Sequence, residues 1–144
     1  MPLLATLLLP CLLAAPVSGP VVAGFAPQGY YGGHWGVDLA VPEGSPVGAA
    51  AAGTVTFAGS VAGMLTVTVN HGGVVRTSYS YLSSVAVSAG DRVARGTVVG
   101  ASGMDHDRAA VHWSLRVGDV YVDPRAACRL AGDTAPAVRL AAIA

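Results

Sequence analysis

Short runs that favour β-strands alternate with turn residues from His34 to about Pro124, and this pattern constrains the fold more than any other feature. The runs are rich in valine, threonine and tyrosine, and glycine, aspartate, asparagine or proline separates them. The predicted strands are Val37–Val41, Thr54–Ala58, Leu65–Asn70, Val74–Leu82, Arg92–Val99, Ala110–Val117 and Val120–Val122. No helical period is visible between them. Such regular spacing is typical of an antiparallel β-sandwich or barrel, so we predict an all-β fold.

The chain of 144 residues fits a single compact domain with two flanking segments. Residues 3–15 form an apolar run of signal-peptide length that is too short for an ordinary spanning helix. We therefore predict an export signal or N-terminal apolar segment at residues 1–19, a β-domain at 20–125 and a C-terminal tail at 126–144. Asp133 and Thr134 before Pro136 could start one short helix in that tail.

The charge balance argues against nucleic acid as a partner, and the two cysteines bear on whether a disulfide forms. Eight basic residues, all arginine, balance eight acidic ones, so no basic patch is expected and nucleic acid is not a predicted partner. Membrane contact is expected only if the N-terminal segment is not cleaved. If Cys11 leaves with that segment, Cys128 is alone and no disulfide forms within the domain. We expect a secreted or cell-envelope monomer.

Two short segments carry residues that could hold a metal ion. His34 and Asp38 are separated by three residues, and a fully extended strand would place their Cα atoms about 13 Å apart. The chain should therefore bend between them, and Gly32, Gly33 and Gly36 can supply the bend. His112 lies on the polar face of a strand whose Val111 and Trp113 alternate toward the core. Imidazole and carboxylate are good zinc ligands. Taken alone, such a pair is more often a local hydrogen bond, and a lone strand histidine is more often structural.

From about Gly24 to Pro124 the sequence resembles the lysostaphin/LytM-type zinc peptidoglycan endopeptidases. The matching segments are His34–Asp38, Leu39–Val47, Ala51–Val55, Val69–Gly73, Ser88–Val93, Gly96–Gly100 and Val111–Trp113. The resemblance implies a β-fold of the duplicated hybrid motif type. It also implies one Zn²⁺ per chain, with His34, Asp38 and His112 as ligands and peptidoglycan peptide as substrate. Three protein ligands plus water is the arrangement of a catalytic zinc site.

The sequence departs from this family at two positions that usually carry helper histidines. Tyr81 replaces one of them and Ala110 replaces the other. General acid–base help is typically worth about 10²–10⁴ in rate, so substitutes matter. We predict that the Tyr81 hydroxyl stabilises an oxyanion. We also predict that His106, or else Asp105 or Asp107, acts as base from the loop at residues 102–109.

Three functions remain open from the sequence. The first is a secreted zinc metallo-endopeptidase that cuts peptide bonds of bacterial cell-wall peptidoglycan. The second is a catalytically degenerate relative that binds cell wall or regulates another wall hydrolase, and the loss of both helper histidines favours it. The third is a domain that zinc merely stabilises. Tyr30, Tyr31 and Trp35 are candidates for substrate contact, while His71 is predicted to cap a turn.

Overall fold

The computed structural model describes residues 13–127, and within them the fold is all-β apart from one helical turn at residues 124–127. The strands are β1 (Val21–Ala23), β2 (Ala26–Gln28), β3 (Gly32–His34), β4 (Val37–Ala40), β5 (Pro46–Gly48), β6 (Gly53–Val61), β7 (Met64–Asn70), β8 (Val75–Val85), β9 (Arg92–Val93), β10 (Val98–Asp105), β11 (Arg108–Val117) and β12 (Val120–Val122). The predicted antiparallel β-fold is confirmed. The helix predicted near Asp133 lies outside the described residues.

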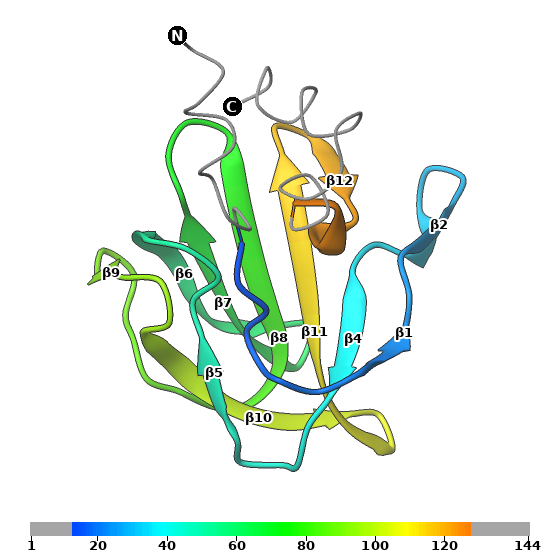
Figure 1. Cartoon of the computed structure of the whole chain (residues 1–144), viewed down its shortest axis with the longest axis horizontal. Helices are drawn as coiled ribbons and strands as arrows, with labels where there is room; N and C mark the ends of the chain where they lie inside the picture. Colours follow the sequence, from blue (N-terminus) through cyan, green and yellow to red (C-terminus); the bar gives the residue numbers. More distant parts are fainter. Residues whose placement is uncertain (1–12, 128–144) are drawn as a thin grey trace, which may run out of the picture.

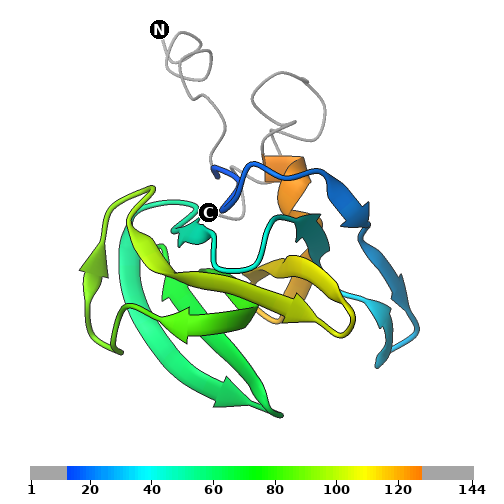
Figure 2. The same ribbon diagram turned by 90° about the horizontal axis from the view of Figure 1, so that it is seen from below.

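One large sheet contains all strands but β2 and β3, which form a separate hairpin. Its order is β1-β4-β11-β10-β8-β7-β6-β9, with β12 added to β11 and β5 added to β10. β8 also pairs directly with β11 over six residue pairs. In Figure 1, β6, β7, β8, β11 and β4 stand side by side while β10 runs across one end of them, and Figure 2 shows this end from below.

Two details of the predicted strands are wrong. The run Arg92–Val99 is two strands, because a turn closed by Thr97 N–H donating to Ala94 O separates β9 from β10. The segment 102–109 is not a loop but most of the β10–β11 hairpin, in which Asp105 pairs with Arg108. His106 turns this hairpin with a φ of 55°. The polar sequence of this segment thus forms a hairpin with a tight two-residue turn.

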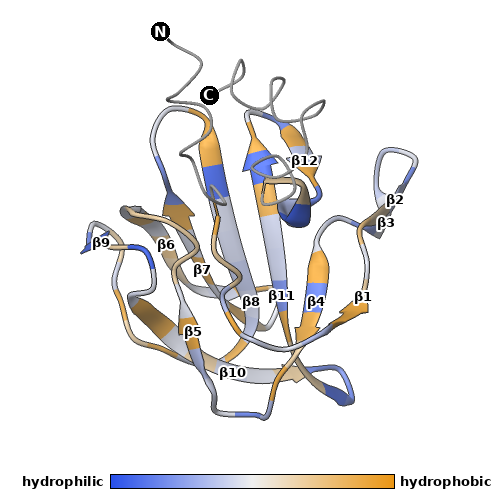
Figure 3. Ribbon diagram, in the orientation of Figure 1, coloured by the Kyte–Doolittle hydropathy of each residue, from blue (hydrophilic) through white to orange (hydrophobic). Residues whose placement is uncertain are grey.

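Alternation along the central strands decides which side chains enter the core. On β11, Val111, Trp113 and Leu115 are no more than 2% exposed, whereas His112 lies on the opposite face and is half-buried. Burying each such apolar side chain stabilises the fold by about 1.5–3 kcal/mol. In Figure 3, β4 is mostly hydrophobic with one hydrophilic band, which corresponds to Asp38 between Val37 and Leu39. The polar residues of the site are thus carried by strands that the core holds rigidly.

A continuous series of hydrogen bonds lies on the core side of the sheet, opposite the face that carries Asp38 and His112. The Ala50 N–H donates to the Tyr79 hydroxyl at 2.7 Å, and that hydroxyl lies 2.6 Å from Thr77 Oγ1. Thr77 Oγ1 lies 2.7 Å from His71 Nε2, and His71 Nδ1 lies 2.9 Å from the carbonyl of Ala52. The hydrogen bonds of the His71 side chain thus go to Ala52 and Thr77 rather than to its own turn, which Asn70 bonds instead.

The residues just before β1 pack against the domain. Leu13 and Val17 belong to the hydrophobic core. Ala14 N–H donates to Ala50 O, and Gly48 N–H donates to Pro16 O. The predicted boundary of the export segment at residue 19 therefore falls inside a stretch that contacts β5, and it stays a prediction. Among the described residues, no helix is long and apolar enough to cross a membrane.

Candidate metal centre

Three neighbouring strands bring together the three predicted metal ligands. Asp38 on β4 is the cross-strand partner of His112 on β11, and His34 ends β3. The chain bends at residues 35–36 between His34 and Asp38, as the sequence predicted. Gly36 permits the close approach, since a Cβ there would lie 2.5 Å from Trp113 O and 2.7 Å from His112 Nε2. The candidate ligand atoms all lie within 4.8 Å of one another.

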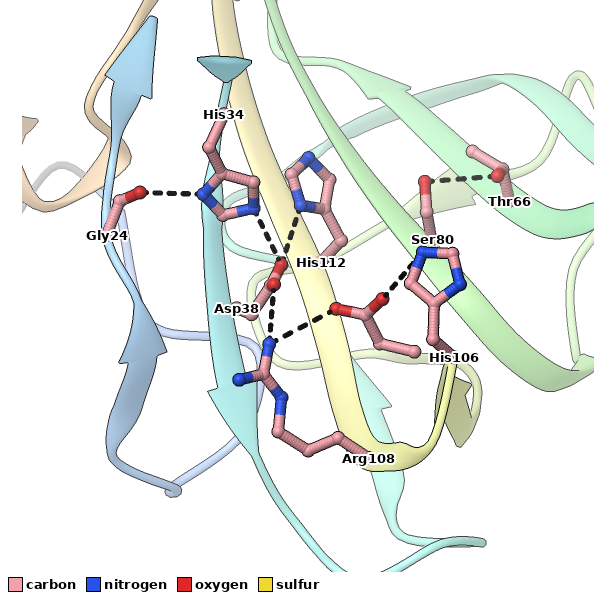
Figure 4. Close-up of polar contacts among 9 residues, drawn as sticks. Gly24, His34, Asp38, Thr66, Ser80, His106, Arg108 and His112 are labelled. Atoms are coloured by element: carbon pink, nitrogen blue, oxygen red, sulfur yellow. Dashed lines mark hydrogen bonds and ion pairs between the residues drawn. The ribbon is translucent and has the colours of Figure 1, made fainter.

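The hydrogen bonds of His34 indicate which of its nitrogens is available. Nδ1 lies 2.7 Å from the carbonyl of Gly24, so this nitrogen carries the proton and donates it. The unprotonated Nε2 then faces Asp38 Oδ1 at 3.1 Å, and His112 Nδ1 lies 2.7 Å from the same oxygen. Two acceptors that face each other require a proton or a cation between them. Figure 4 shows both imidazoles directed at this carboxylate.

The electrostatics of the centre keep Asp38 ionised. Burial alone would raise the pKa of this carboxyl, which is only 4% exposed. The hydrogen bond with His112 and the neighbouring imidazoles reverse that effect and lower the pKa of Asp38 to about 2. The opposite holds for Asp105, whose pKa is raised by burial and by the nearby Asp38 carboxylate. A negative charge is thus held where a metal ligand needs it.

The two predicted helper residues flank this centre in a pocket of about 340 Å³. The Tyr81 ring lies 5.7 Å from the His106 ring and 6.5 Å from the His112 ring. β8 carries one residue more than β7 between the pairs Tyr79–Val67 and Leu82–Leu65, and Tyr81 sits in this bulge with a φ of 62°. A positive φ is costly for tyrosine, and bulges commonly re-aim side chains beside active sites.

His106 and the neighbouring carboxylates lie at different depths. The His106 side chain is 84% exposed, with Nε2 at 3.7 Å from Asp105 Oδ1. Asp105 lines the pocket and is buried. Asp107, the third residue considered as a base, is exposed in the hairpin turn and is not among the residues that line the pocket.

Sequence reasoning did not single out Arg108, a charged residue of the pocket. Arg108 Nη2 donates to Asp38 Oδ2 at 3.1 Å and lies 3.6 Å from Asp105 Oδ2. The signal was present in the sequence, because alternation places Arg108, Ala110 and His112 on one face of the same strand.

A wider groove of about 730 Å³ continues from the metal pocket and shares Met64, Ser80 and His112 with it. Its aromatic wall includes Tyr30 and Tyr31 in the β2–β3 turn, Trp35, and Tyr121 on β12. The two last rings meet edge to face with centroids 5.9 Å apart. The serine and threonine residues that line it are Thr66, Thr68, Ser78, Ser80 and Ser114. The aromatic residues expected to contact substrate therefore border one continuous groove.

Residues 32–124 match Peptidase family M23, and the chain belongs to this family of zinc-dependent peptidases. The resemblance read from the sequence is thereby confirmed. The matched range starts at β3 and ends after β12, so it includes every residue of the centre described above.

Two solved structures illustrate the shared fold. A putative peptidase M23 from Pseudomonas aeruginosa is 34% identical with a TM-score of 0.70, and the match covers 83% of this chain and 52% of that one. The antimicrobial peptidase lysostaphin from Staphylococcus simulans is 29% identical with a TM-score of 0.67, covering 87% and 53%.

Curated relatives are longer proteins. An uncharacterised protein of Mycobacterium tuberculosis is 42% identical over 100 residues, which are 64% of this chain and 40% of that protein. The DD-carboxypeptidase/endopeptidase Mpg of Neisseria meningitidis is 34% identical over 94 residues, which are 63% and 22%. The chain thus spans 40% or less of the length of the curated relatives it matches.

Proposed function

We propose that the chain is a zinc metallo-endopeptidase that acts on peptide bonds of bacterial cell-wall peptidoglycan after export to the cell envelope. The observation that carries this proposal is the meeting of His34 Nε2, His112 Nδ1 and an ionised Asp38 oxygen at one point. Membership of Peptidase family M23 supports the reaction class, and the groove beside the centre supports an extended substrate.

The donor set fits zinc better than other common cations. Two imidazole nitrogens and one carboxylate oxygen suit zinc, whereas calcium and magnesium prefer oxygen ligands. Three protein ligands also leave a coordination position free. When bound, zinc would lower the pKa of a water and polarise the scissile carbonyl.

The residues around the centre have separate tasks in this proposal. Burial and the negative charges of Asp105 and Asp38 raise the pKa of Tyr81, so its hydroxyl stays protonated at neutral pH. A protonated hydroxyl can donate a hydrogen bond to the oxyanion that forms when the peptide carbonyl is attacked. His106 stands on a tight turn beside Tyr81 and is exposed enough to exchange protons with solvent. We propose that it carries a proton to or from the reacting groups.

A second function is favoured by one specific observation. Both positions where the resemblance predicts helper histidines hold other residues, Tyr81 and Ala110, and the Ala110 side chain is fully buried and inert. A domain that binds wall peptide in the groove, or that regulates another hydrolase, would need neither histidine. In this alternative the centre would hold zinc without turnover.

Metal content and wall digestion separate these functions. The full chain would be analysed for zinc and incubated with purified peptidoglycan, beside His112→Ala and the control Glu43→Gln, which removes an exposed turn carboxylate. One zinc per chain with release of muropeptides, both lost in His112→Ala and kept in the control, is the expected result. Zinc without release would favour the binding domain. Absence of zinc from the wild type would contradict the ligand assignment.

A further inference from the structure

The two oxygens of the Asp38 carboxylate have different neighbours. Oδ1 faces His34 Nε2 at 3.1 Å and His112 Nδ1 at 2.7 Å. Oδ2 accepts a hydrogen bond from Arg108 Nη2 at 3.1 Å. In Figure 4 the imidazoles therefore lie on one side of this carboxylate and the guanidinium on the other.

Two small side chains leave room for the Arg108 side chain to reach Asp38. Arg108, Ala110 and His112 project from the same face of β11, because side chains alternate along a strand. The cross-strand partner of Ala110 is Ala40, and that of His112 is Asp38. Arg108 is two residues from Ala110 on this face, so the register leaves only the two alanines between Arg108 and Asp38. A larger side chain at residue 110 would stand in its way.

A second carboxylate holds the guanidinium at this place. Asp105 is the cross-strand partner of Arg108 at the end of the hairpin, and its Oδ2 lies 3.6 Å from Arg108 Nη2. The Arg108 side chain is 45% exposed, whereas Asp105 is buried. An ion pair with so exposed a partner adds at most about 1 kcal/mol to stability. The main effect of the Asp105–Arg108 ion pair is to orient the guanidinium toward Asp38.

We infer that Arg108 is a positioning residue that keeps Asp38 a one-oxygen metal ligand; this inference rests on the zinc-binding function proposed above. Carboxylates bind metal ions through one oxygen or through both. Because the guanidinium holds Oδ2, only Oδ1 is available beside the imidazoles. A coordination position then stays free for water or substrate. Groups that orient ligands in this way commonly change metal affinity or activity about 10–100-fold when they are removed.

The number of zinc ligands tests this role more directly than zinc affinity does. Removing Arg108 would remove a repelling charge and a positioning contact at once, and these changes shift the affinity in opposite directions. X-ray absorption on the zinc-loaded full chain instead counts the atoms that bind the metal. We expect about four in the wild type and about five in Arg108→Met, because the released Oδ2 would also bind. The absorption spectrum of the cobalt-substituted protein should change in parallel.

Two further variants sharpen the test. Arg108→Lys keeps a cationic donor within reach of Oδ2 and should retain the wild-type ligand number. Arg116→Met is the matched control, since Arg116 lies on the same face of the same strand but bonds Gly118 O and Asp119. It should also behave as the wild type does.

The outcomes separate this inference from the proposed function. If zinc binds and Arg108→Met shows the wild-type ligand number and cobalt spectrum, Arg108 is only a surface ion pair and the inference is overturned. If Arg116→Met shows the same change as Arg108→Met, the effect is not specific to Asp38 and the inference is likewise overturned. If the wild type binds no zinc, the proposed function fails, and the inference fails with it.

Discussion

Histidine and tyrosine occur in two regions of the molecule, the buried hydrogen-bond network and the metal centre, but their surroundings differ. In the buried network, His71 Nδ1 and Nε2 both have partners from the chain, Ala52 O and Thr77 Oγ1. In the metal centre, His34 Nδ1 is likewise held by a carbonyl, that of Gly24, but its Nε2 faces a carboxylate oxygen. A histidine whose unprotonated nitrogen faces a donor has all its hydrogen bonds satisfied. One whose unprotonated nitrogen faces another acceptor requires a proton or a cation between them.

The tyrosines of the two regions repeat this contrast. Tyr79 is fully buried, and its hydroxyl is bonded to Ala50 N–H and Thr77. Tyr81, two residues on, has a φ of 62° and turns toward the pocket at the β8 bulge. Strained backbone persists only where the surroundings impose it, and it clusters at functional sites. The comparison therefore separates His71 and Tyr79, whose bonds the chain itself completes, from His34 and Tyr81, for which we propose a part in the chemistry.

The largest expected effect separates the two histidines. His34→Ala should abolish zinc binding and peptidoglycan cleavage while the metal-free protein keeps most of its free energy of unfolding. The bond of His34 to Gly24 O is exposed, so water can replace it, and Asp38 keeps its bonds to His112 and Arg108. His71→Ala should retain zinc but lose about 1–3 kcal/mol of stability, since it leaves the buried Thr77 hydroxyl without its acceptor. Zinc analysis and urea unfolding in chelator measure both quantities. Loss of zinc in both variants would break the contrast.

The tyrosines should differ in the same way but by less. Tyr81→Phe removes only the proposed oxyanion donor, so turnover should fall about 10²-fold with unchanged stability. Tyr79→Phe leaves the buried Ala50 N–H unpaired, so it should cost about 1–3 kcal/mol with turnover unchanged. Muropeptide release rates and urea unfolding report these effects. Equal turnover in Tyr81→Phe and the wild type would remove Tyr81 from the mechanism.

The backbone of Tyr81 supplies a further prediction of opposite sign. Glycine adopts a positive φ without the steric cost that tyrosine bears. Tyr81→Gly should therefore raise the free energy of unfolding by up to about 1 kcal/mol, measured in urea, while lowering turnover at least as much as Tyr81→Phe does. Gly63, already at a φ of 83° in an open turn, offers the matched control, because Gly63→Ala should destabilise. A less stable Tyr81→Gly protein would mean that the tyrosine ring packs usefully.

Periodicity and turn residues were sufficient to predict most strands and the inward face of β11, because alternation is a local property. The metal ligands followed from motif spacing and a family resemblance, and the structure brings His34, Asp38 and His112 together. Arg108 was not found, although it lies on the same strand face as His112. Its role depends on the register that places Ala110 opposite Ala40 and Asp38 opposite His112. The buried bonds of His71 likewise join residues from separate strands and loops, which no local pattern reveals.

The smallest expected effect is a pH dependence that belongs to the buried network alone. Burial lowers the pKa of His71 below its usual 6.5, because desolvation disfavours the charged imidazole. Below pH 6.5 the unfolded chain then binds more protons at this residue than the folded one does. Its contribution to stability is therefore complete above that pH and declines as the pH falls toward the lowered value.

Urea unfolding in chelator at several pH values between about 5 and 8 would measure this decline. His71→Gln, which cannot titrate, isolates it, since the difference in free energy between wild type and variant should shrink in acid. The other histidines are the same in both proteins, so their contribution cancels in that difference. If that difference stayed constant with pH, His71 would take up its proton without losing the bond to Thr77. The proposed contrast between the buried network and the metal centre would then fail.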